Sequence, residues 1–493
     1  MVLYFDLLWV ASGRIVTALI TIASLRIMTS LLDPKDYGHY TLLIAFQGFC
    51  GLILISPVGL HINRHTHTWW DEGTLLKRLI RYNRYLLAIS AGIALVVLMW
   101  GITYPSANQK IPTALLSACA VSAMVYMSTW NGTFITILNM LGHRIGSIGW
   151  MLASTIIGLG CASLFAYVYQ TGTSWLLGQA LGMTVGAVGA GFTLRNYQAA
   201  KKMVDVCSNN LSTFVNLQTI QNYCLPLAVA TGLMWLQNAG YRFWVEKTWG
   251  PTELGLLAVG LSITSQIWNM FESLSMQFLN PYFFRQITIL KSISQKSVLL
   301  SDLVNVLWPI YAVLAGFNIV FASSILAILT NERYHTDATF VLIGVIIEFA
   351  RCTGNLWSYA AQIERRSTKY ILPYALGAMI VIGGVLGLSA APGNIEMFAI
   401  CLGTSGLVIC GAMVITMQRM VPVKLDIYKW LAGTAVLLVC VAAGIFMPLK
   451  TDGLLNTILQ ISVGLFVSGG VMLALLWNDP ALKRLLAVSL RGP

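Results

Sequence analysis

Long apolar runs separated by short polar connections fill most of this sequence. The runs far exceed the ~10 residues of a membrane-spanning strand and match the ~20 residues that a helix needs to cross ~30 Å of hydrocarbon. We therefore predict an all-α polytopic membrane protein with 14 transmembrane helices. These spans are expected at about residues 4–31, 38–63, 84–104, 112–140, 145–168, 174–196, 214–240, 252–283, 299–329, 338–362, 370–390, 395–418, 428–449 and 455–478.

Composition agrees with this pattern. Of the 493 residues, 57% are hydrophobic and only 10% are charged, whereas soluble domains carry roughly 25% charged residues. The nine cysteines form no Cys-x-x-Cys pair, so we predict no zinc site or disulfide framework. No nucleotide-binding loop is found, and no cofactor or metal is expected.

The basic residues indicate the topology. Most of the 30 lysines and arginines fall in every second connection and in the C-terminal tail, so the positive-inside rule predicts that both termini are cytoplasmic. The longest basic connection, residues 64–84, has the pattern of a short amphipathic helix on the inner membrane surface. The net charge of +12 thus reflects the basic residues expected on the cytoplasmic side of the membrane. A nucleic-acid partner is excluded because no soluble module carries a basic stripe.

A short polar motif occurs twice, each time between apolar runs. "SLLDPKDYGHYTLLIAF" (Ser30–Phe46) is echoed by "KTWGPTELGLLAVGLS" (Lys247–Ser262), and "NGTFITILNMLGHR" (Asn131–Arg144) is echoed in the same order by "TGNLWSYAAQIERR" (Thr353–Arg366). In the first pair, one constant offset aligns Pro34, Asp36 and Gly38 with Pro251, Glu253 and Gly255. Proline and an acidic residue in this order are typical of the first turn of a helix.

This repeat predicts two lobes of six helices each. An even number of spans per half gives both halves the same orientation, related by a pseudo-twofold axis along the membrane normal, with a substrate site between them. The expected domains are an N-lobe at residues 1–205, a C-lobe at 206–420, and two additional helices with a cytoplasmic tail at 421–493.

Four arginines in or beside the spans are candidate ligands for a diphosphate. An ionisable residue at the centre of a bilayer costs at least ~2.5–3.5 kcal/mol, so each one invites a functional interpretation. Guanidinium groups stay charged and bind phosphate oxygens in pairs. The alternative is that their side chains reach the headgroups. These candidates are Arg14, Arg26, Arg242 and Arg351.

Two acidic residues in the predicted spans are candidates for ion coupling. Glu348 lies three residues before Arg351, on the same helical face. The pair is either a structural salt bridge or a gate, in which substrate competes for Arg351 and lets Glu348 take a proton. Glu272 stands alone in apolar sequence and is the second candidate.

The motifs around the repeated turns resemble a known family. "LRIMTSLLDPKDYGHYTLL" resembles the first outer turn of the polysaccharide transporter family, which includes the O-antigen (Wzx-type) flippases. That family belongs to the multidrug/oligosaccharidyl-lipid/polysaccharide (MOP) flippase superfamily. "YRFWVEKTWGPTELGLLAV" resembles the equivalent turn of the second half. Arg242 matches the arginine of an Asp–Arg pair there, and Tyr241 replaces the acid.

The resemblance implies a transporter rather than an enzyme. Such a flippase would move an undecaprenyl-diphosphate-linked oligosaccharide from the cytoplasmic to the periplasmic leaflet of the bacterial inner membrane, by alternating access, for polysaccharide biosynthesis. A proton or Na⁺ gradient is the expected energy source. Expected partners are this lipid, the surrounding membrane lipids and a polysaccharide polymerase with its chain-length machinery, and the protein is expected to be a monomer.

Other functions stay open at this point. A cation-coupled multidrug exporter of the same superfamily would need acidic residues in its cavity, whereas the spans of the first half offer arginines and only Asp6 at the margin. A membrane subunit of a polysaccharide synthase would be distinguished only by identifying its partners. A membrane glycosyltransferase is disfavoured because the outer loops have about ten residues or fewer.

Overall fold

The described part of the chain is helical. A computed structural model describes residues 2–103, 111–204, 225, 228–290, 292–335, 338–364, 366–389, 395–446, 453–477 and 479–484. Among these residues there is no β-strand, and 12 helices are long and apolar enough to cross a membrane, with a shorter apolar helix at Ile15–Leu31. The predicted all-α polytopic fold is therefore confirmed. The first part of the predicted span at 214–240 lies outside the described residues, apart from residue 225, and residues 228–240 are described.

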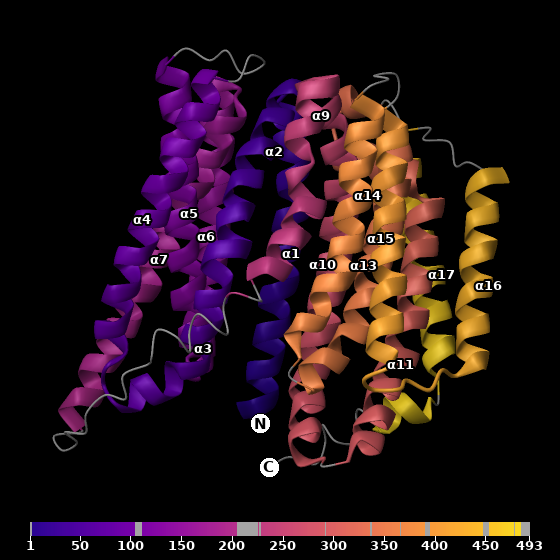
Figure 1. The fold of residues 1–493 in the computed structure, drawn as a ribbon. Helices are drawn as coiled ribbons and strands as arrows, with labels where there is room; N and C mark the ends of the chain where they lie inside the picture. Colours follow the sequence, from indigo (N-terminus) through magenta and orange to yellow (C-terminus); the bar gives the residue numbers. More distant parts are fainter. Residues whose placement is uncertain are drawn as a thin grey trace. The chain divides into compact units, whose positions relative to one another are not determined.

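The chain divides into two compact units, residues 1–255 and 256–493 (Figure 1). The elements of the first unit are α1 (Val2–Leu31), α2 (Pro34–Phe49), the π-helix η1 (Cys50–Ile55), α3 (Ser56–Asp71), α4 (Leu75–Thr103), α5 (Ile111–Met140), α6 (Arg144–Tyr169), α7 (Gly172–Val204), the π-helix η2 (Leu236–Gly240) and α9 (Arg242–Trp249). Helix α10 (Pro251–Ile289) begins in the first unit and continues into the second.

The second unit contains the remaining helices. They are α11 (Ile293–Val320), α12 (Ala322–Leu329), η3 (Glu332–Tyr334), α13 (Thr339–Ile363), η4 (Ser367–Tyr370), α14 (Ile371–Ser389), α15 (Ile395–Gln418), α16 (Ile427–Phe446) and α17 (Leu454–Leu476). The last two helices correspond to the predicted spans 13 and 14.

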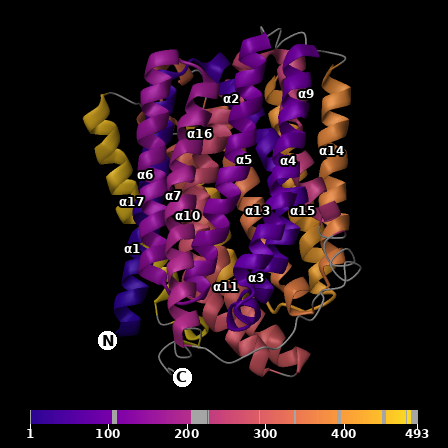
Figure 2. The same ribbon diagram turned by 90° about the vertical axis from the view of Figure 1, so that its left-hand side faces the viewer.

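Helices α4 to α7 run alongside one another in the first unit (Figures 1 and 2). Helix α7 packs on both α5 and α6, α4 packs on α5, and α1 packs on α6. A Cβ atom on Gly182 would collide with the backbone of Gly158, so α7 and α6 approach at backbone distance. Small residues are the usual means of such close packing between membrane helices. On α4, buried positions recur every three or four residues, as expected for one helical face.

The second predicted span lies in one continuous helical run that changes helix type part-way along. Helix α2 leads through the π-helix η1 directly into α3. Pro57 lies at the start of α3 and has no backbone N–H to continue the hydrogen-bond ladder, which accounts for a local change of helix type. The predicted amphipathic surface helix at residues 64–84 is wrong. Its first part continues α3 to Asp71 and its second part begins α4 at Leu75.

Helix α11 is the most enclosed candidate span in the described chain. It packs against α13, α16 and α17. The Trp308 ring on α11 stacks on the Trp430 ring of α16, with centroids 3.8 Å apart. Asp302 on α11 also accepts a hydrogen bond of 2.8 Å from Nε of Arg484, close to the described end of the chain. An aromatic stack thus attaches α16 to α11, and an ionic contact attaches the segment that follows α17.

Candidate functional site

An ionic cluster lies between α10 and α13 in the second unit. Nε of Arg351 donates to Oε2 of Glu348 at 2.7 Å, and Nη1 of Arg351 donates to Oε2 of Glu272 at 2.8 Å. The side chains of Glu348 and Glu272 are 10% and 17% exposed, and that of Arg351 is 30% exposed. The helical spacing of Glu348 and Arg351 predicted their pairing, and the structure adds Glu272, which is therefore not a lone acid.

Two amides complete this cluster. Nη2 of Arg351 donates to Oδ1 of Asn269 at 3.0 Å, and Nδ2 of Asn355 donates to Oε1 of Glu272 at 2.8 Å. Each of the three guanidinium nitrogens of Arg351 thus donates to a protein group. The described geometry matches the salt-bridge alternative, and a substrate anion would have to displace one of these partners to reach Arg351.

The charges in the cluster do not balance. Two carboxylates face one guanidinium, which leaves a formal charge of −1 when both acids are ionised. An uncompensated charge away from water is costly. A proton or a monovalent cation bound here would remove that excess, and this is the chemical behaviour expected of an ion-coupling site.

Arg242 lies in the first unit, where η2 ends and α9 begins. Its Nη1 donates to the backbone carbonyl of Thr41 at 3.1 Å. Its Nε is buried and has no hydrogen-bond partner among the described residues. The neighbouring Phe243 ring packs edge-on against Phe46 of α2, with centroids 4.7 Å apart. Arg242 is therefore held against α2 while its Nε has no acceptor among the described residues.

The other two predicted arginines lie on α1. The side chain of Arg26 is half-buried, and its neighbours Leu25 and Met28 are buried. The side chain of Arg14 lies outside the described part of the structure, as does that of Asp6. Among the six predicted site residues, the structure therefore brings Glu272, Glu348 and Arg351 together, and it assigns Arg26 and Arg242 to the first unit.

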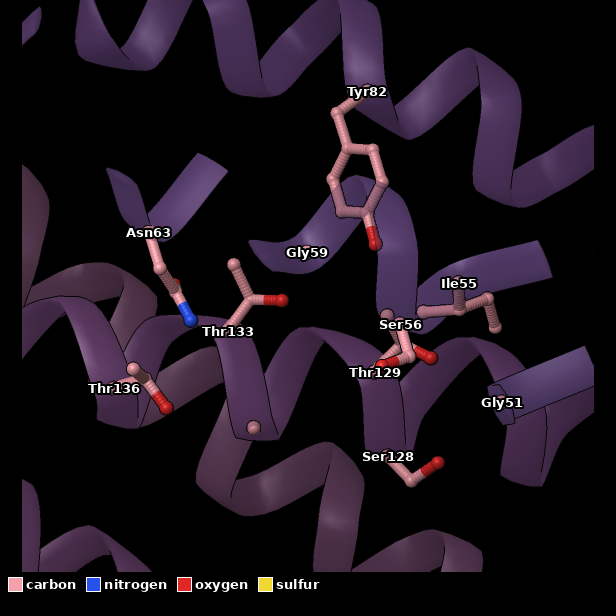
Figure 3. Close-up of a pocket in the computed structure, with 11 residues that line it drawn as sticks. Gly51, Ile55, Ser56, Gly59, Asn63, Tyr82, Ser128, Thr129, Thr133 and Thr136 are labelled. Atoms are coloured by element: carbon pink, nitrogen blue, oxygen red, sulfur yellow. The ribbon is translucent and has the colours of Figure 1, made fainter. Parts of the chain in front are cut away.

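A polar cavity of about 300 Å³ lies within the first unit, between η1, α3, α4 and α5 (Figure 3). Its lining contains four threonine or serine hydroxyls from α5, a serine and an asparagine from α3, a tyrosine from α4, and three glycines. These residues, with one isoleucine, are Gly51, Ile55, Ser56, Gly59, Asn63, Tyr82, Ser128, Thr129, Gly132, Thr133 and Thr136, of which Ser128, Thr129, Thr133 and Thr136 supply the α5 hydroxyls. None of the lining residues is charged.

Tyr82 is the most buried polar group of this cavity, with 6% of its surface exposed. Its hydroxyl has no hydrogen-bond partner among the described residues, and Figure 3 shows it directed toward Ser56 and Thr129. The Tyr82 ring packs edge-on against Trp130, which in turn donates to Asn83 at 3.2 Å. The ring is thus fixed while the hydroxyl is left without an acceptor.

A second cavity of about 330 Å³ adjoins the first. The two share lining residues from η1 and α5, and the second is bounded toward α2 by Gln47. Nε2 of Gln47 donates to Oγ of Ser128, which lines both cavities, in a weak hydrogen bond of 3.4 Å.

Neither cavity was predicted from the sequence. The hydroxyls of α5 are visible in the string "STWNGTFIT", and their spacing places them along one side of a helix. Similar polar groups in membrane helices usually hold helices together, as buried Asn131 does by donating to Ser154 at 3.3 Å. The cavity lies where η1 and α3 face these hydroxyls.

Comparison with known proteins defines the fold. No protein-family model matches the chain, and no curated protein matches it by sequence. A solved structure described as the lipid II flippase MurJ in an inward closed conformation aligns with 96% of this chain and 99% of its own, at 11% identity and a TM-score of 0.65. An inward-facing MATE-family multidrug transporter of the MOP superfamily aligns with 86% of this chain and 98% of its own, at 12% identity and a TM-score of 0.58.

A third structure, a MOP superfamily transporter from Pyrococcus furiosus, is described as having a binding pocket of reversed polarity. It aligns with 87% of this chain and 96% of its own, at 11% identity and a TM-score of 0.54. This protein has the fold of the MOP superfamily transporters. The similarity covers nearly the full length of each structure, and it fits a multi-pass membrane protein.

Proposed function

We propose that this protein is a flippase for an undecaprenyl-diphosphate-linked oligosaccharide, acting from the cytoplasmic to the periplasmic leaflet of a bacterial inner membrane. The observation that carries the proposal is Arg242, an arginine held against α2 at the start of α9, whose buried Nε has no acceptor among the described residues. A guanidinium with an unused donor suits a phosphate oxygen. A multidrug exporter for cations would instead need a free carboxylate.

The overall fold agrees with this substrate class. The lipid II flippase aligns with 96% of this chain, whereas the MATE transporters align with 86% and 87%. Two C-terminal helices beyond the two six-helix lobes would account for the larger aligned share of this chain. Helices α16 and α17 occupy that part of the sequence. Fold similarity alone does not assign a substrate, whereas the charge of Arg242 favours an anionic one.

The proposed mechanism is alternating access, as in other transporters built from repeated halves. An oligosaccharide diphosphate loses its water partners in hydrocarbon, at a cost of several kcal/mol for each unsatisfied group. The protein replaces those partners with arginines and hydroxyls while the lipid tail stays in the bilayer. The Glu272–Arg351–Glu348 cluster, with its excess negative charge, is the proposed site for the coupling proton or Na⁺.

Two experiments test the proposal. In the native host, deletion of the gene should make a lipid-linked saccharide accumulate in the inner leaflet. In proteoliposomes, the purified protein should move that lipid between leaflets, faster with an imposed proton or Na⁺ gradient. Transport of a cationic dye without any effect on the lipid would favour the multidrug exporter. Normal surface polysaccharide after deletion would contradict the proposed pathway.

A further inference from the structure

The polar cavity of the first unit combines features that point to a neutral, hydroxyl-rich ligand. Serine, threonine and tyrosine hydroxyls both donate and accept hydrogen bonds, and so does the asparagine amide. Sugar hydroxyls have the same dual character. A metal cation would require carboxylates or carbonyls as ligands, and a phosphate would require basic groups. The cavity lining offers neither acids nor bases.

An unsatisfied group marks the cavity as more than a packing defect. The Tyr82 hydroxyl is buried without a hydrogen-bond partner among the described residues, and it is directed toward Ser56 and Thr129 in the cavity lining. A buried polar group without a hydrogen-bond partner is unfavourable, because it has lost its water partners without replacement. A ligand hydroxyl in the cavity would satisfy it.

The size and location of the cavity also fit a small ligand that enters from the cytoplasmic side. Its volume of about 300 Å³ is at the lower end of the range for small-molecule sites, roughly 300–1,000 Å³. Tyr82 lies seven residues after the start of α4 and Thr136 four residues before the end of α5. At 1.5 Å per residue both are within about 6–11 Å of the turns that the charge pattern predicts to be cytoplasmic.

We propose that this cavity binds one uncharged sugar residue of the transported lipid. The inference rests on the proposed flippase function and adds the site of the saccharide. Loading from the cytoplasmic side would place the sugar against Tyr82 and the α5 hydroxyls. Discrimination between saccharide-bearing and sugar-free lipids would then arise in the first unit.

Gly132 allows a direct test. A Cβ on Gly132 meets nothing within 4 Å, so a larger side chain would fill the cavity without displacing protein atoms. Gly92 on α4 is also exposed, its Cβ would likewise meet nothing within 4 Å, and it does not line the cavity. Gly132→Val and Gly92→Val are therefore matched variants. Tyr82→Phe removes only the unsatisfied hydroxyl and keeps the ring against Trp130.

The full-length variants are purified, checked by size exclusion and thermal unfolding, and titrated with two probes. One probe is the lipid-linked saccharide isolated from the deletion strain, and the other is undecaprenyl diphosphate. Gly132→Val should weaken binding of the saccharide lipid by about tenfold or more, which is 1.4 kcal/mol, and leave binding of undecaprenyl diphosphate unchanged. Tyr82→Phe should weaken only the saccharide lipid, by about threefold to tenfold, as expected for one hydrogen bond.

The outcomes separate the two proposals. If the wild-type protein binds neither probe, the flippase function itself is wrong. If it binds both, and Gly132→Val affects both equally or neither, or acts no differently from Gly92→Val, the flippase proposal stands and the sugar site is wrong.

Discussion

Gly38 and Gly255 occupy equivalent positions in the repeated turn, and they pack against each other reciprocally. A Cβ on Gly38 would collide with the carbonyl oxygen of Pro251, and a Cβ on Gly255 would collide with that of Pro34. In each direction, the added carbon would also lie 3.2 Å from the backbone nitrogen of the other glycine. The motif that the sequence repeats is therefore a close contact between two helix starts, and each copy provides the space that the other occupies.

Gly38→Ala should destabilise the protein. The obstructing atoms belong to the backbone of Pro251, which cannot rotate aside as a side chain can, and overpacking of this kind costs about 1–3 kcal/mol. Thermal unfolding in detergent measures the effect, at roughly 2–4 °C for each kcal/mol. Gly92→Ala is the control, because its Cβ meets nothing and alanine favours a helix. Equal melting temperatures for the two variants would contradict the close contact.

The double variant Gly38→Ala/Gly255→Ala tests whether the contact is shared. Once the first substitution has separated the two helix starts, the second meets less resistance. We expect the combined loss of stability to be smaller than the sum of the single losses, because neighbouring substitutions are not additive. Full additivity would indicate that the two glycines act separately.

The sequence predicted those features that depend on neighbouring residues. The starts of α2 and α10 follow from proline and an acidic residue in the first turn, and the pairing of Glu348 with Arg351 follows from helical spacing. The contact of Glu272 with Arg351 could not be predicted, because it requires the crossing of α10 and α13. The polar cavity was missed for a similar reason, since it depends on η1 and on the approach of α4 to α5.

Removal of the Arg351 charge alone should destabilise the protein more than removal of all three charges of the cluster. Arg351→Ala leaves Glu272 and Glu348 close together without a cation, and breaking such a pair costs about 3–5 kcal/mol. In a Glu272→Gln/Glu348→Gln background, the same substitution leaves no unpaired charge and should cost much less. Thermal unfolding of the four variants forms the cycle. A similar cost in both backgrounds would show that the charges contribute little.

The excess negative charge predicts a dependence of stability on cations. A proton or Na⁺ that binds the folded cluster should raise the melting temperature, and a ligand at 100 times its Kd contributes about 2.7 kcal/mol. Wild-type protein should therefore gain stability when Na⁺ replaces choline at pH 7, or when the pH is lowered. Glu272→Gln balances the charges and should lose this gain. The proposed coupling site is wrong if the variant responds as the wild type does.

Asn305 should anchor the connection between α15 and α16. Its Nδ2 donates to the carbonyl of Lys424 at 2.8 Å, and its Oδ1 accepts from the backbone nitrogen of Asp426 at 3.0 Å and from Nε1 of Trp430 at 3.2 Å. Asn305→Ala leaves these three groups without their hydrogen-bond partner. Each one that is buried should lower the stability by about 1–3 kcal/mol. We expect faster tryptic cleavage after Lys424, which is exposed. Asn139→Ala, at an exposed position of α5, should leave the cleavage rate unchanged.

Arg242 should be required for recognition of the diphosphate. Arg242→Lys keeps the positive charge but loses the planar fork that can hold Thr41 and a phosphate oxygen together. Binding of undecaprenyl diphosphate should fall by about tenfold or more, because hydrogen bonds to charged groups are worth about 1.5–3 kcal/mol. Lys247→Ala removes an exposed positive charge from the same helix and controls for nonspecific attraction. Because Arg242 also contacts α2, each variant is first compared by thermal unfolding. An undiminished affinity of a folded Arg242→Lys variant would remove the observation on which the flippase proposal depends.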